Sequence, residues 1–363
     1  MIRQSQVEEE ICDGGWCVRA ASPSTNMRIA IATDAWQPQI NGVVRTLGQT
    51  GAHMKELGHE VRFITPLDFV TYPCPTYPSI RLAVFPKQGV RRMLREFRPQ
   101  AIHIATEGPI GHAARSLCLS RSLPFTTSYH TQFPEYVRAR FPLPLSWSYA
   151  YLRRYHSRAA RTMIATRSMQ RLLQERGFKN LEIWARGVDS NLFRPGPKSF
   201  LTGARPISMY MGRVAVEKNI EAFLNLELPG SKYVVGDGPD LEHLKGRYPD
   251  VTFTGQKLGQ ELTAHIAAAD VFVFPSLTDT FGLVLLEAMA CGVPVAAFPV
   301  TGPIDVVRNG KTGILDIDLR KAILGALTLD PADCVDYARQ HSWRNWTERF
   351  VSLLEPFEAS RWD

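Results

Sequence analysis

Several signatures that define common classes of protein are missing from this chain of 363 residues. Its six cysteines form no C-x-x-C pair and no zinc-binding spacing, which favours a reduced, cytoplasmic protein. The longest stretch of low polarity, residues 283–300, contains Glu287, Pro294 and Pro299, so it would make a poor membrane span. No N-terminal stretch pairs a basic region with an apolar one, so no secretory signal is expected. A globular protein with roughly two hydrophobic cores remains.

The sequence also lacks the usual signatures of nucleotide-cofactor sites. The first expected strand, residues 27–33, is not followed by G-x-G-x-x-G. The nearest approach to that pattern, Gly236-Asp237-Gly238, has Leu241 where the third glycine belongs. No Walker A sequence is present either. A nicotinamide cofactor and a P-loop are therefore not expected, and we predict no bound cofactor.

Charge is unevenly distributed along the chain, whose net charge is +7. Residues 1–190 carry 25 basic and 14 acidic side chains, whereas residues 191–363 carry 17 and 21. This asymmetry predicts that the first half faces something anionic. The densest basic segment, residues 138–176, has nine arginines and a single acid, Glu175.

Aromatic side chains interleave this basic segment, in which residues 144–161 are predicted to form a helix. The aromatic residues are Phe141, Trp147, Tyr149, Tyr151 and Tyr155. Trp, Tyr and Arg together suit the headgroup level of an anionic bilayer, so we predict membrane contact between Arg138 and Arg161. One alternative is a solvated helix whose aromatics pack into the core. Nucleic-acid binding is a weaker alternative, because no module signature supports it, and no nucleic-acid partner is predicted.

Residues 1–26 differ from the rest of the chain and show no clear period, so we expect an N-terminal extension that is disordered or not native. From Met27 on, short apolar strands alternate with helical patterns such as residues 43–57 and 111–120. The strands of the first series are expected at residues 27–33, 60–64, 80–85, 101–105, 125–128, 162–166 and 181–185.

A second series follows the turn-rich stretch at residues 195–198. Its strands are expected at residues 207–211, 232–235, 251–254, 271–275, 293–298 and 313–316. Two consecutive β/α series predict an α/β protein with two doubly wound, Rossmann-like parallel sheets facing across a cleft. The expected domains are residues 27–190 and 191–342, with a C-terminal helix in residues 343–363 packing back on the first.

Three groups of residues could bind phosphates or hydroxyl groups. Asn41-Gly42 leads directly into a helix, so the backbone at Gly42 could approach a phosphate, although an ordinary tight turn would look the same. Arg213 and Lys218 follow the first strand of the second series and could converge on a diphosphate. The alternative for these two cations is a surface ion pair with Glu217.

The third group lies around the start of a helix near Gly282. The amides of Gly282, Leu283 and Val284 could hold a phosphate there. Glu287, in the second turn, is flanked by apolar residues, and a buried carboxylate needs hydrogen-bond donors such as vicinal sugar hydroxyls. The alternative is a structural glutamate bonded to nearby backbone. Asp279 lies eight positions before Glu287, in the loop that enters the helix.

These motifs occur in one characteristic order. They are Gly212-Arg213 with Glu217-Lys218, then Gly236-Asp237-Gly238-Pro239, then Asp279 with Glu287-Ala288; the first half adds Asn41-Gly42-Val43, Ser128-Tyr129-His130-Thr131 and Arg186-Gly187-Val188-Asp189. The combination resembles glycosyltransferase family 4, whose members have the GT-B fold and retain anomeric configuration. The match covers nearly everything after Met27. It is most similar to the branch with sulfoquinovosyl- and glucuronosyl-diacylglycerol synthases and lipid α-mannosyltransferases. The family usually has glutamate where this chain has Asp279.

The resemblance implies a role for each matching residue. Glu287 would hold the ribose hydroxyls, and Asp279 with the following backbone would face the transferred sugar. Arg213 and Lys218 would neutralise the departing diphosphate, which makes a metal ion unnecessary. Gly42 would bring backbone close to the phosphates. His130 would contact the donor sugar near the reacting carbon.

The function implied is transfer of a hexosyl or hexuronosyl group, with retention, from a nucleotide-diphosphate sugar to a lipid. In this interpretation residues 27–190 form the acceptor-side domain, and residues 191–342 bind the nucleotide sugar. We favour a UDP-sugar as donor, diacylglycerol as acceptor, and a peripheral location on the cytoplasmic face of the membrane. The alternatives are a GDP-mannose-dependent α-mannosyltransferase, transfer to a soluble oligosaccharide, and a non-catalytic protein that binds membranes or nucleic acid.

Overall fold

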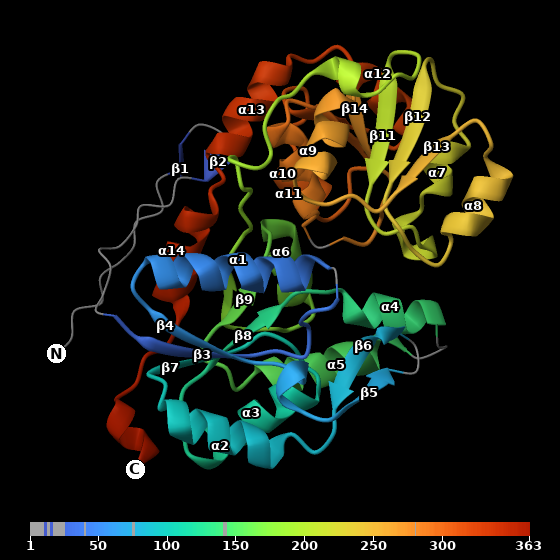
Figure 1. The fold of residues 1–363 in the computed structure, drawn as a ribbon. Helices are drawn as coiled ribbons and strands as arrows, with labels where there is room; N and C mark the ends of the chain where they lie inside the picture. The colour runs from blue at the N-terminus through green and yellow to red at the C-terminus, as the bar shows by residue number, and fades with distance from the viewer. Residues whose placement is uncertain are drawn as a thin grey trace. The chain divides into compact units, whose positions relative to one another are not determined.

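The chain is described by a computed structural model that covers residues 11–12, 15–16, 26–39, 41–74, 77–140, 144–279 and 281–363 (Figure 1). It divides into two compact units. Unit 1 comprises the described residues up to Ala165, Gln170–Ala185 and Trp343–Asp363; unit 2 comprises Thr166–Met169 and Arg186–Ser342. Most of the expected N-terminal extension lies outside the described residues. Two short antiparallel strands within it are described, β1 (Ile11–Cys12) and β2 (Gly15–Trp16).

A six-stranded parallel sheet forms the centre of unit 1, in the order β10-β9-β8-β7-β3-β4. Its strands are β3 (Arg28–Ala32), β4 (Glu60–Ile64), β7 (Ala101–Ile104), β8 (Thr126–Tyr129), β9 (Thr162–Ile164) and β10 (Leu181–Ile183). The helices along this part of the chain are α1 (Gly42–Glu56), α2 (Lys87–Phe97), α3 (Pro109–Ser120), α4 (Phe133–Arg140), α5 (Leu145–His156), α6 (Arg167–Glu175) and, from the C-terminus, α14 (Trp343–Leu353). In Figure 1, α1 covers one face of the sheet, and α2 and α3 cover the other.

One expected strand of unit 1 lies elsewhere. The segment predicted as a sheet strand at residues 80–85 belongs to β6 (Tyr77–Ala83), which pairs antiparallel with β5 (Thr71–Cys74) in a separate hairpin. A period-two apolar pattern is the same for a hairpin and for a sheet edge, so the sequence does not distinguish them. The 3-10 turn η1 (Pro66–Asp68) precedes this hairpin.

Unit 2 contains a second six-stranded parallel sheet, in the order β13-β12-β11-β14-β15-β16. Its strands are β11 (Ile207–Met211), β12 (Ser231–Val235), β13 (Thr252–Gly255), β14 (Val271–Phe274), β15 (Val295–Ala297) and β16 (Gly313–Leu315). Its helices are α7 (Glu221–Leu224), α8 (Leu241–Arg247), α9 (Gly259–Ala268), α10 (Leu283–Ala290), α11 (Pro303–Val306), α12 (Leu319–Ala326) and α13 (Pro331–Arg339), with 3-10 turns at η2 (Lys198–Phe200) and η3 (Val216–Lys218). The predicted fold class, two doubly wound parallel sheets, is confirmed.

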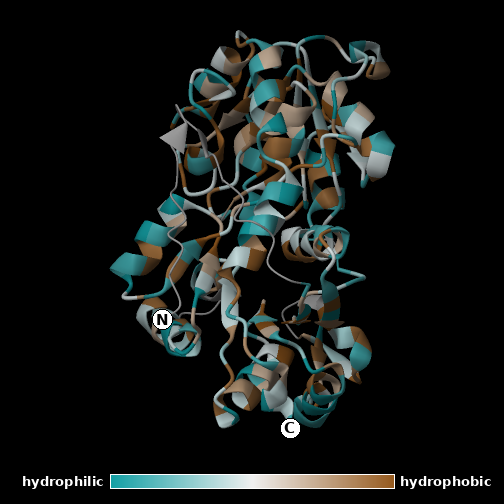
Figure 2. Ribbon diagram, turned by 90° about the vertical axis from the view of Figure 1, so that its left-hand side faces the viewer, coloured by the Kyte–Doolittle hydropathy of each residue, from teal (hydrophilic) through white to brown (hydrophobic). Residues whose placement is uncertain are grey.

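Each sheet packs against its helices through a hydrophobic core of its own. Every residue of β7, β11 and β14 is buried, as expected for parallel strands with helices on both faces. The helices carry both colours of the hydropathy scale, brown and teal, along their length (Figure 2). Each fully buried Leu, Ile or Phe contributes about 1.5–3 kcal/mol relative to an exposed one. No helix in the described part of the chain combines the length and the apolar character that crossing a bilayer requires.

The boundary between the units differs slightly from the one expected after residue 190. The amide of Ser168 donates to Asp305 (3.0 Å), and the amide of Val188 donates to the carbonyl of His341 (2.9 Å). These bonds attach residues 166–169 and 186–190 to unit 2.

The C-terminal segment is anchored within unit 1 by hydrogen bonds to residues far away in the sequence. The indole of Trp362 donates to the carbonyl of Pro99 (2.7 Å), and the guanidinium of Arg161 donates to Glu355 (2.8 Å). Helix α14 packs against α1.

Candidate functional site

The topology of unit 2 marks one edge of its sheet. Starting from β11, each of the next two strands, β12 and β13, is added on one side of the sheet. The following strands, β14 to β16, are added on the other side of β11. In doubly wound sheets, ligands bind outside the carboxyl ends of the strands where the order reverses, here between β11 and β14. The loops at this switch point carry Arg213, Lys218 and Asp279.

The loop after β11 is packed backbone to backbone against the loop after β12. A Cβ on Gly236 would lie 1.8 Å from the carbonyl oxygen of Gly212, and one on Gly238 would lie 2.1 Å from that of Val214. The amide of Val214 donates to the carbonyl of Asp237 (2.9 Å). The Gly-Asp-Gly motif is therefore required by the close approach of the two loops, which fixes the backbone that carries Arg213.

Lys218 and Asp279 form an ion pair at this switch point. Lys218 Nζ lies 2.6 Å from Oδ1 and 2.9 Å from Oδ2 of Asp279, with 21 % and 19 % of the two side chains exposed. This pair joins the loop after β11 to the loop after β14, 61 positions further along the chain. Because Asp279 already binds Lys218, a diphosphate at this site would share the lysine with the carboxylate.

The side chain of Arg213 is exposed, and a hydrogen bond from a buried residue holds its main chain. The buried hydroxyl of Tyr210 donates to the carbonyl of Arg213 (2.8 Å). Burial, helped by the negative charges of Asp279 and Glu217, holds the pKa of Tyr210 well above its ordinary value. Tyr210 is therefore a permanent donor that fixes the backbone at Arg213.

The next part of the site is the start of α10. Gly282 precedes the helix with φ of 82°, a left-handed conformation that glycine adopts without strain. The residues predicted to hold a phosphate, Gly282, Leu283 and Val284, are partly exposed, and Thr280 lies outside the described residues. Glu287 is only 4 % exposed. Burial, with the charge of Glu287, raises the pKa of Cys291 to about 12, which keeps that thiol protonated.

Two hydroxyl groups in the loop after β14 were not predicted from the sequence. The side-chain oxygens of Ser276 and Thr278 are buried and have no hydrogen-bond partner among the described residues. A buried hydroxyl without a partner costs about 1–3 kcal/mol, so these atoms are candidates for ligand contacts. The sequence signal that could have indicated them is a pair of small hydroxylic residues directly after a buried strand.

Unit 1 has an equivalent switch point between β3 and β7. The loop after β3 leads to Gly42, the first residue of α1, and Asn41 caps this helix. The side-chain oxygen of Asn41 accepts from the amides of Val43 and Val44 (both 3.0 Å). These two amides already donate to Asn41, so fewer backbone N–H groups at the start of α1 can bind a phosphate than the sequence alone indicated.

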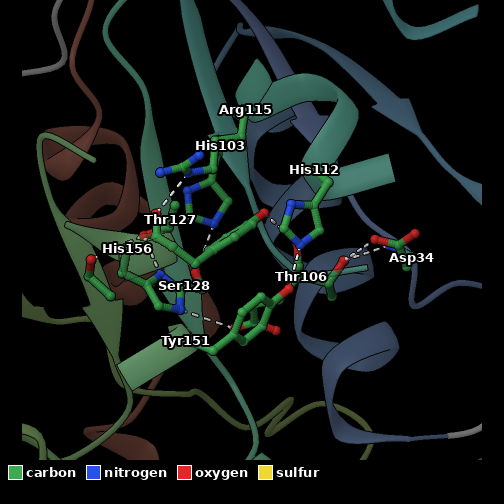
Figure 3. A network of polar contacts seen from close by, with 12 residues as sticks. Asp34, His103, Thr106, His112, Arg115, Thr127, Ser128, Tyr151 and His156 are labelled. Carbon is green, nitrogen blue, oxygen red and sulfur yellow. Dashed lines mark hydrogen bonds and ion pairs between the residues drawn. The ribbon is translucent and has the colours of Figure 1, made fainter. Parts of the chain in front are cut away.

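Asp34, in the loop after β3, joins this loop to the start of α3 by hydrogen bonds. Its carboxylate accepts from the amides of Ile110 (2.9 Å) and Gly111 (3.2 Å) at the start of α3, and from the hydroxyl of Thr106 (2.9 Å). Figure 3 shows Asp34 facing Thr106. Burial is the largest influence on this carboxyl and raises its pKa above the ordinary 3.8. These hydrogen bonds of Asp34 were not predicted from the sequence.

His130 follows β8 at the same edge of the sheet and is half-buried. Its ring packs edge-on against the buried Trp184, with centroids 5.9 Å apart. Glu107, after β7, lies 3.2 Å from the imidazole Nε2 of His156 at the end of α5. His130 and Glu107 therefore both sit at the carboxyl ends of strands of this sheet.

The basic and aromatic segment of unit 1 divides its aromatic rings between core and solvent. In α5, Tyr149 and Tyr155 are buried, whereas Trp147 (69 %) and Tyr151 (46 %) are exposed. Phe141 lies outside the described residues. The alternative that the aromatic rings pack into the core therefore holds for Tyr149 and Tyr155. The rings of Trp147 and Tyr151 are exposed and could contact a partner.

Two family models match the chain. "Glycosyltransferase Family 4" matches residues 40–192, and "Glycosyl transferases group 1" matches residues 205–327. A GDP-mannose-dependent α-mannosyltransferase of Mycolicibacterium smegmatis is 32 % identical over 80 % of this chain and 85 % of that protein. The sulfoquinovosyl transferase SQD2 of Arabidopsis thaliana is 32 % identical over 72 % of this chain and 58 % of that protein.

Solved structures show the same fold. Anabaena HepE in complex with UDP-glucose superposes with a TM-score of 0.67 at 15 % identity, covering 90 % of this chain and 99 % of HepE. The sucrose-phosphate synthase of Thermosynechococcus elongatus gives a TM-score of 0.66 at 22 % identity, covering 90 % of this chain and 98 % of the synthase. The chain therefore has the GT-B fold and belongs to glycosyltransferase family 4.

Proposed function

We propose that this glycosyltransferase is a retaining, metal-independent enzyme that moves a hexosyl or hexuronosyl group from a nucleotide-diphosphate sugar to a lipid acceptor. The observation that carries the proposal is the Lys218–Asp279 pair at the switch point of unit 2, with Arg213 on the same loop and the buried Glu287 on α10. The two cations match the diphosphate of such a donor, and the buried carboxylate matches its ribose.

Each side chain then has a defined role in the reaction. The bond between the sugar carbon and the diphosphate oxygen breaks, a bond to the acceptor hydroxyl oxygen forms on the same face, and the departing phosphate takes the hydroxyl proton. Negative charge grows on the leaving oxygen in the transition state, so Arg213 and Lys218 stabilise the transition state more than the bound donor. Asp279 orients Lys218 and faces the transferred sugar, and Glu287 accepts the ribose hydroxyls.

The remaining predicted residues complete the donor site. The amides of Gly282, Leu283 and Val284 approach the phosphates, as does the backbone at Gly42, and His130 contacts the transferred sugar. UDP-sugars are the favoured donors. GDP-mannose is the first alternative, since relatives at 30–32 % identity are named GDP-mannose-dependent α-mannosyltransferases.

A lipid acceptor is supported by relatives and by the surface. The α-monoglucosyldiacylglycerol synthase of Streptococcus pneumoniae is 26 % identical over 84 % of this chain. In α5, the exposed Trp147 and Tyr151 lie on the same helix as Arg153 and Arg154, which are also exposed. Aromatic rings among cations suit an anionic bilayer surface, and we place the enzyme on the cytoplasmic face of the membrane.

A second surface of unit 1 has the same character. Phe85 (91 %), Val70 (80 %) and Leu67 (68 %) are exposed around the β5–β6 hairpin. Helix α2 follows directly, and its outward face bears Lys87, Arg91, Arg92 and Arg95, all exposed. We call these residues the α2 surface. Repulsion from Arg91 is the largest influence on Arg95 and lowers its pKa, so the cations are crowded, and an anionic surface would relieve that crowding.

A donor-by-acceptor screen tests the proposal. Purified protein is incubated with UDP- or GDP-sugars and with dioleoylglycerol in phosphatidylglycerol vesicles, and products are identified by mass spectrometry. A new glycolipid with retained anomeric configuration in the presence of EDTA is the expected result. Transfer only to soluble oligosaccharides would overturn the lipid part. Binding of UDP or GDP with no transfer to any acceptor would overturn the enzymatic role.

A further inference from the structure

The switch point of unit 1 carries two carboxylates of contrasting exposure. Asp34 follows β3, and Glu107 follows β7. Asp34 is 5 % exposed, and its carboxylate already accepts the hydroxyl of Thr106 and two backbone amides of α3. The side chain of Glu107 is 27 % exposed. At the place where this topology binds ligands, Glu107 is therefore the carboxylate that a ligand can reach.

A chain of buried hydrogen bonds holds Glu107. Nε2 of His156 lies 3.2 Å from Glu107 Oε1, and Nδ1 lies 2.9 Å from the hydroxyl of Thr127. The hydroxyl of Thr127 lies 3.1 Å from that of Thr162 on the next strand. An ionised carboxylate only accepts, so for a neutral ring Nε2–H donates to Glu107 and Nδ1 accepts from Thr127. Figure 3 shows His156 beside Thr127 within this network.

His103, a buried histidine on the sheet of unit 1, provides a structural comparison for His156 on α5. His103, on β7, is fully buried, and its two nitrogens lie 2.9 Å from the hydroxyl of Thr126 and 2.8 Å from that of Ser128. Both contacts stay within the sheet. The side chain of His156 is equally enclosed (2 % exposed), but its hydrogen bonds end on a carboxylate that reaches solvent.

The surroundings of Glu107 suit a neutral, hydroxylated ligand. Burial is the largest influence on Tyr151 and Tyr155, and the charge of Glu107 adds to the rise in the pKa of both. These tyrosines therefore remain neutral beside the carboxylate. His112, whose pKa is lowered chiefly by burial, contacts the hydroxyl of Tyr151. Arg115 is a cation of this region, with its guanidinium 5.3 Å from the ring centroid of Tyr155. A carboxylate beside neutral hydroxyl groups is a good hydrogen-bond acceptor for alcohol groups.

We propose that Glu107 is a substrate-binding residue that accepts a hydrogen bond from a hydroxyl of the acceptor, and that His156 is a positioning residue that holds it through the contact with Thr127. The inference rests on the proposed function and names one residue of unit 1 as a contact of the acceptor. The group that Glu107 would bind is an alcohol group of the acceptor, either the hydroxyl that receives the sugar or one next to it.

The test separates acceptor binding from donor binding. Glu107→Gln keeps the size of the side chain and removes the charge, and the acceptor is the one that the screen above identifies. We expect kcat/KM for the acceptor to fall about 10- to 100-fold, while the affinity for UDP or GDP, measured by calorimetry, stays within about twofold. Glu135→Gln is the matched control, because Glu135 is a carboxylate of unit 1 held by the hydroxyl of Tyr149.

Two substitutions of His156 test positioning. Glutamine can place a donor where Nε2 stands, whereas asparagine can place its polar group only near Nδ1, so His156→Gln should retain more acceptor activity than His156→Asn. The two should have similar melting temperatures. His103→Gln is the control for general loosening of the sheet and should leave the KM for the acceptor unchanged.

Unchanged acceptor kinetics in Glu107→Gln, or equal losses in the two His156 variants, would overturn the inference and leave the proposed function standing. A wild-type protein that binds nucleotide and transfers nothing would overturn the proposed function, and the inference with it.

Discussion

At the switch point of unit 2, Lys218 and Asp279 face each other with about a fifth of each side chain exposed, whereas at the switch point of unit 1 Asp34 is buried under amides of α3. Both places lie outside the carboxyl ends of parallel strands where the strand order reverses. In unit 2 the charges remain accessible, and in unit 1 one carboxylate is used to join β3 to α3. Shared topology therefore sets where a site can form, and local hydrogen bonding decides whether its charges are available to a ligand.

The largest expected effect is on the accessible charges of unit 2. Arg213→Ala and Lys218→Ala should each lower kcat about 10²- to 10³-fold, because the charge on the leaving diphosphate grows in the transition state. Steady-state kinetics with the identified donor measures this. Lys245→Ala is the control, since Lys245 pairs with Glu242 on the exposed side of α8. Full kcat in Lys218→Ala would show that the switch point of unit 2 is not the reaction site.

Glu287→Gln should weaken nucleotide binding about 10- to 100-fold, because an amide accepts hydroxyl groups less strongly than a carboxylate does. Calorimetry with UDP and GDP measures this loss, and Glu242→Gln, an exposed carboxylate of the same unit, is the control. A loss of thermal stability without a loss of nucleotide affinity would make Glu287 a structural residue.

Asp34→Ala should affect stability instead of donor binding. The variant leaves the amides of Ile110 and Gly111 without an acceptor, which costs about 1–3 kcal/mol in the free energy of unfolding. Nucleotide affinity should not change. Urea unfolding measures the cost, and Asp318→Ala, which removes the exposed cap of α12, is the control.

The pH dependence sharpens this prediction. Burial raises the pKa of Asp34 above 3.8, so its charged form is less favourable in the folded than in the unfolded protein. The wild-type protein therefore loses this contribution to stability as the pH rises from 3.8 through the raised pKa. The deficit of Asp34→Ala should be smaller at about pH 7 than at about pH 4. A deficit that grows with pH would contradict the raised pKa.

The smallest effect is expected on the outer surface of unit 1. Arg91→Gln, on the α2 surface, should weaken binding to phosphatidylglycerol vesicles about fivefold and leave nucleotide affinity unchanged. Vesicle co-sedimentation measures this, with Arg154→Gln on α5 as the parallel variant. A loss only in Arg154→Gln would assign membrane contact to the segment between Arg138 and Arg161, and a loss in neither would argue against an electrostatic membrane contact.

Much of the fold could be predicted because its signals are local. Apolar runs of four to seven residues separated by helical patterns indicated both parallel sheets, and most strands lie within two residues of their expected ends. The β5–β6 hairpin was assigned to the wrong sheet because pairing partners are not encoded in a strand's own pattern. The residues of the proposed donor site, Arg213, Lys218, Asp279 and Glu287, were candidates because they stand in recognisable motifs.

The sequence by itself determined the two-sheet architecture, the family, and which charged residues are candidates for the proposed donor site. Only the tertiary structure decided which of these groups meet: it pairs Lys218 with Asp279, 61 positions away, buries Asp34 beneath α3, and places His156, 49 positions from Glu107, where it can hold that carboxylate. The reason is physical. A motif records which chemistry is present along the chain, whereas accessibility and partnership arise only when distant segments pack and exclude water.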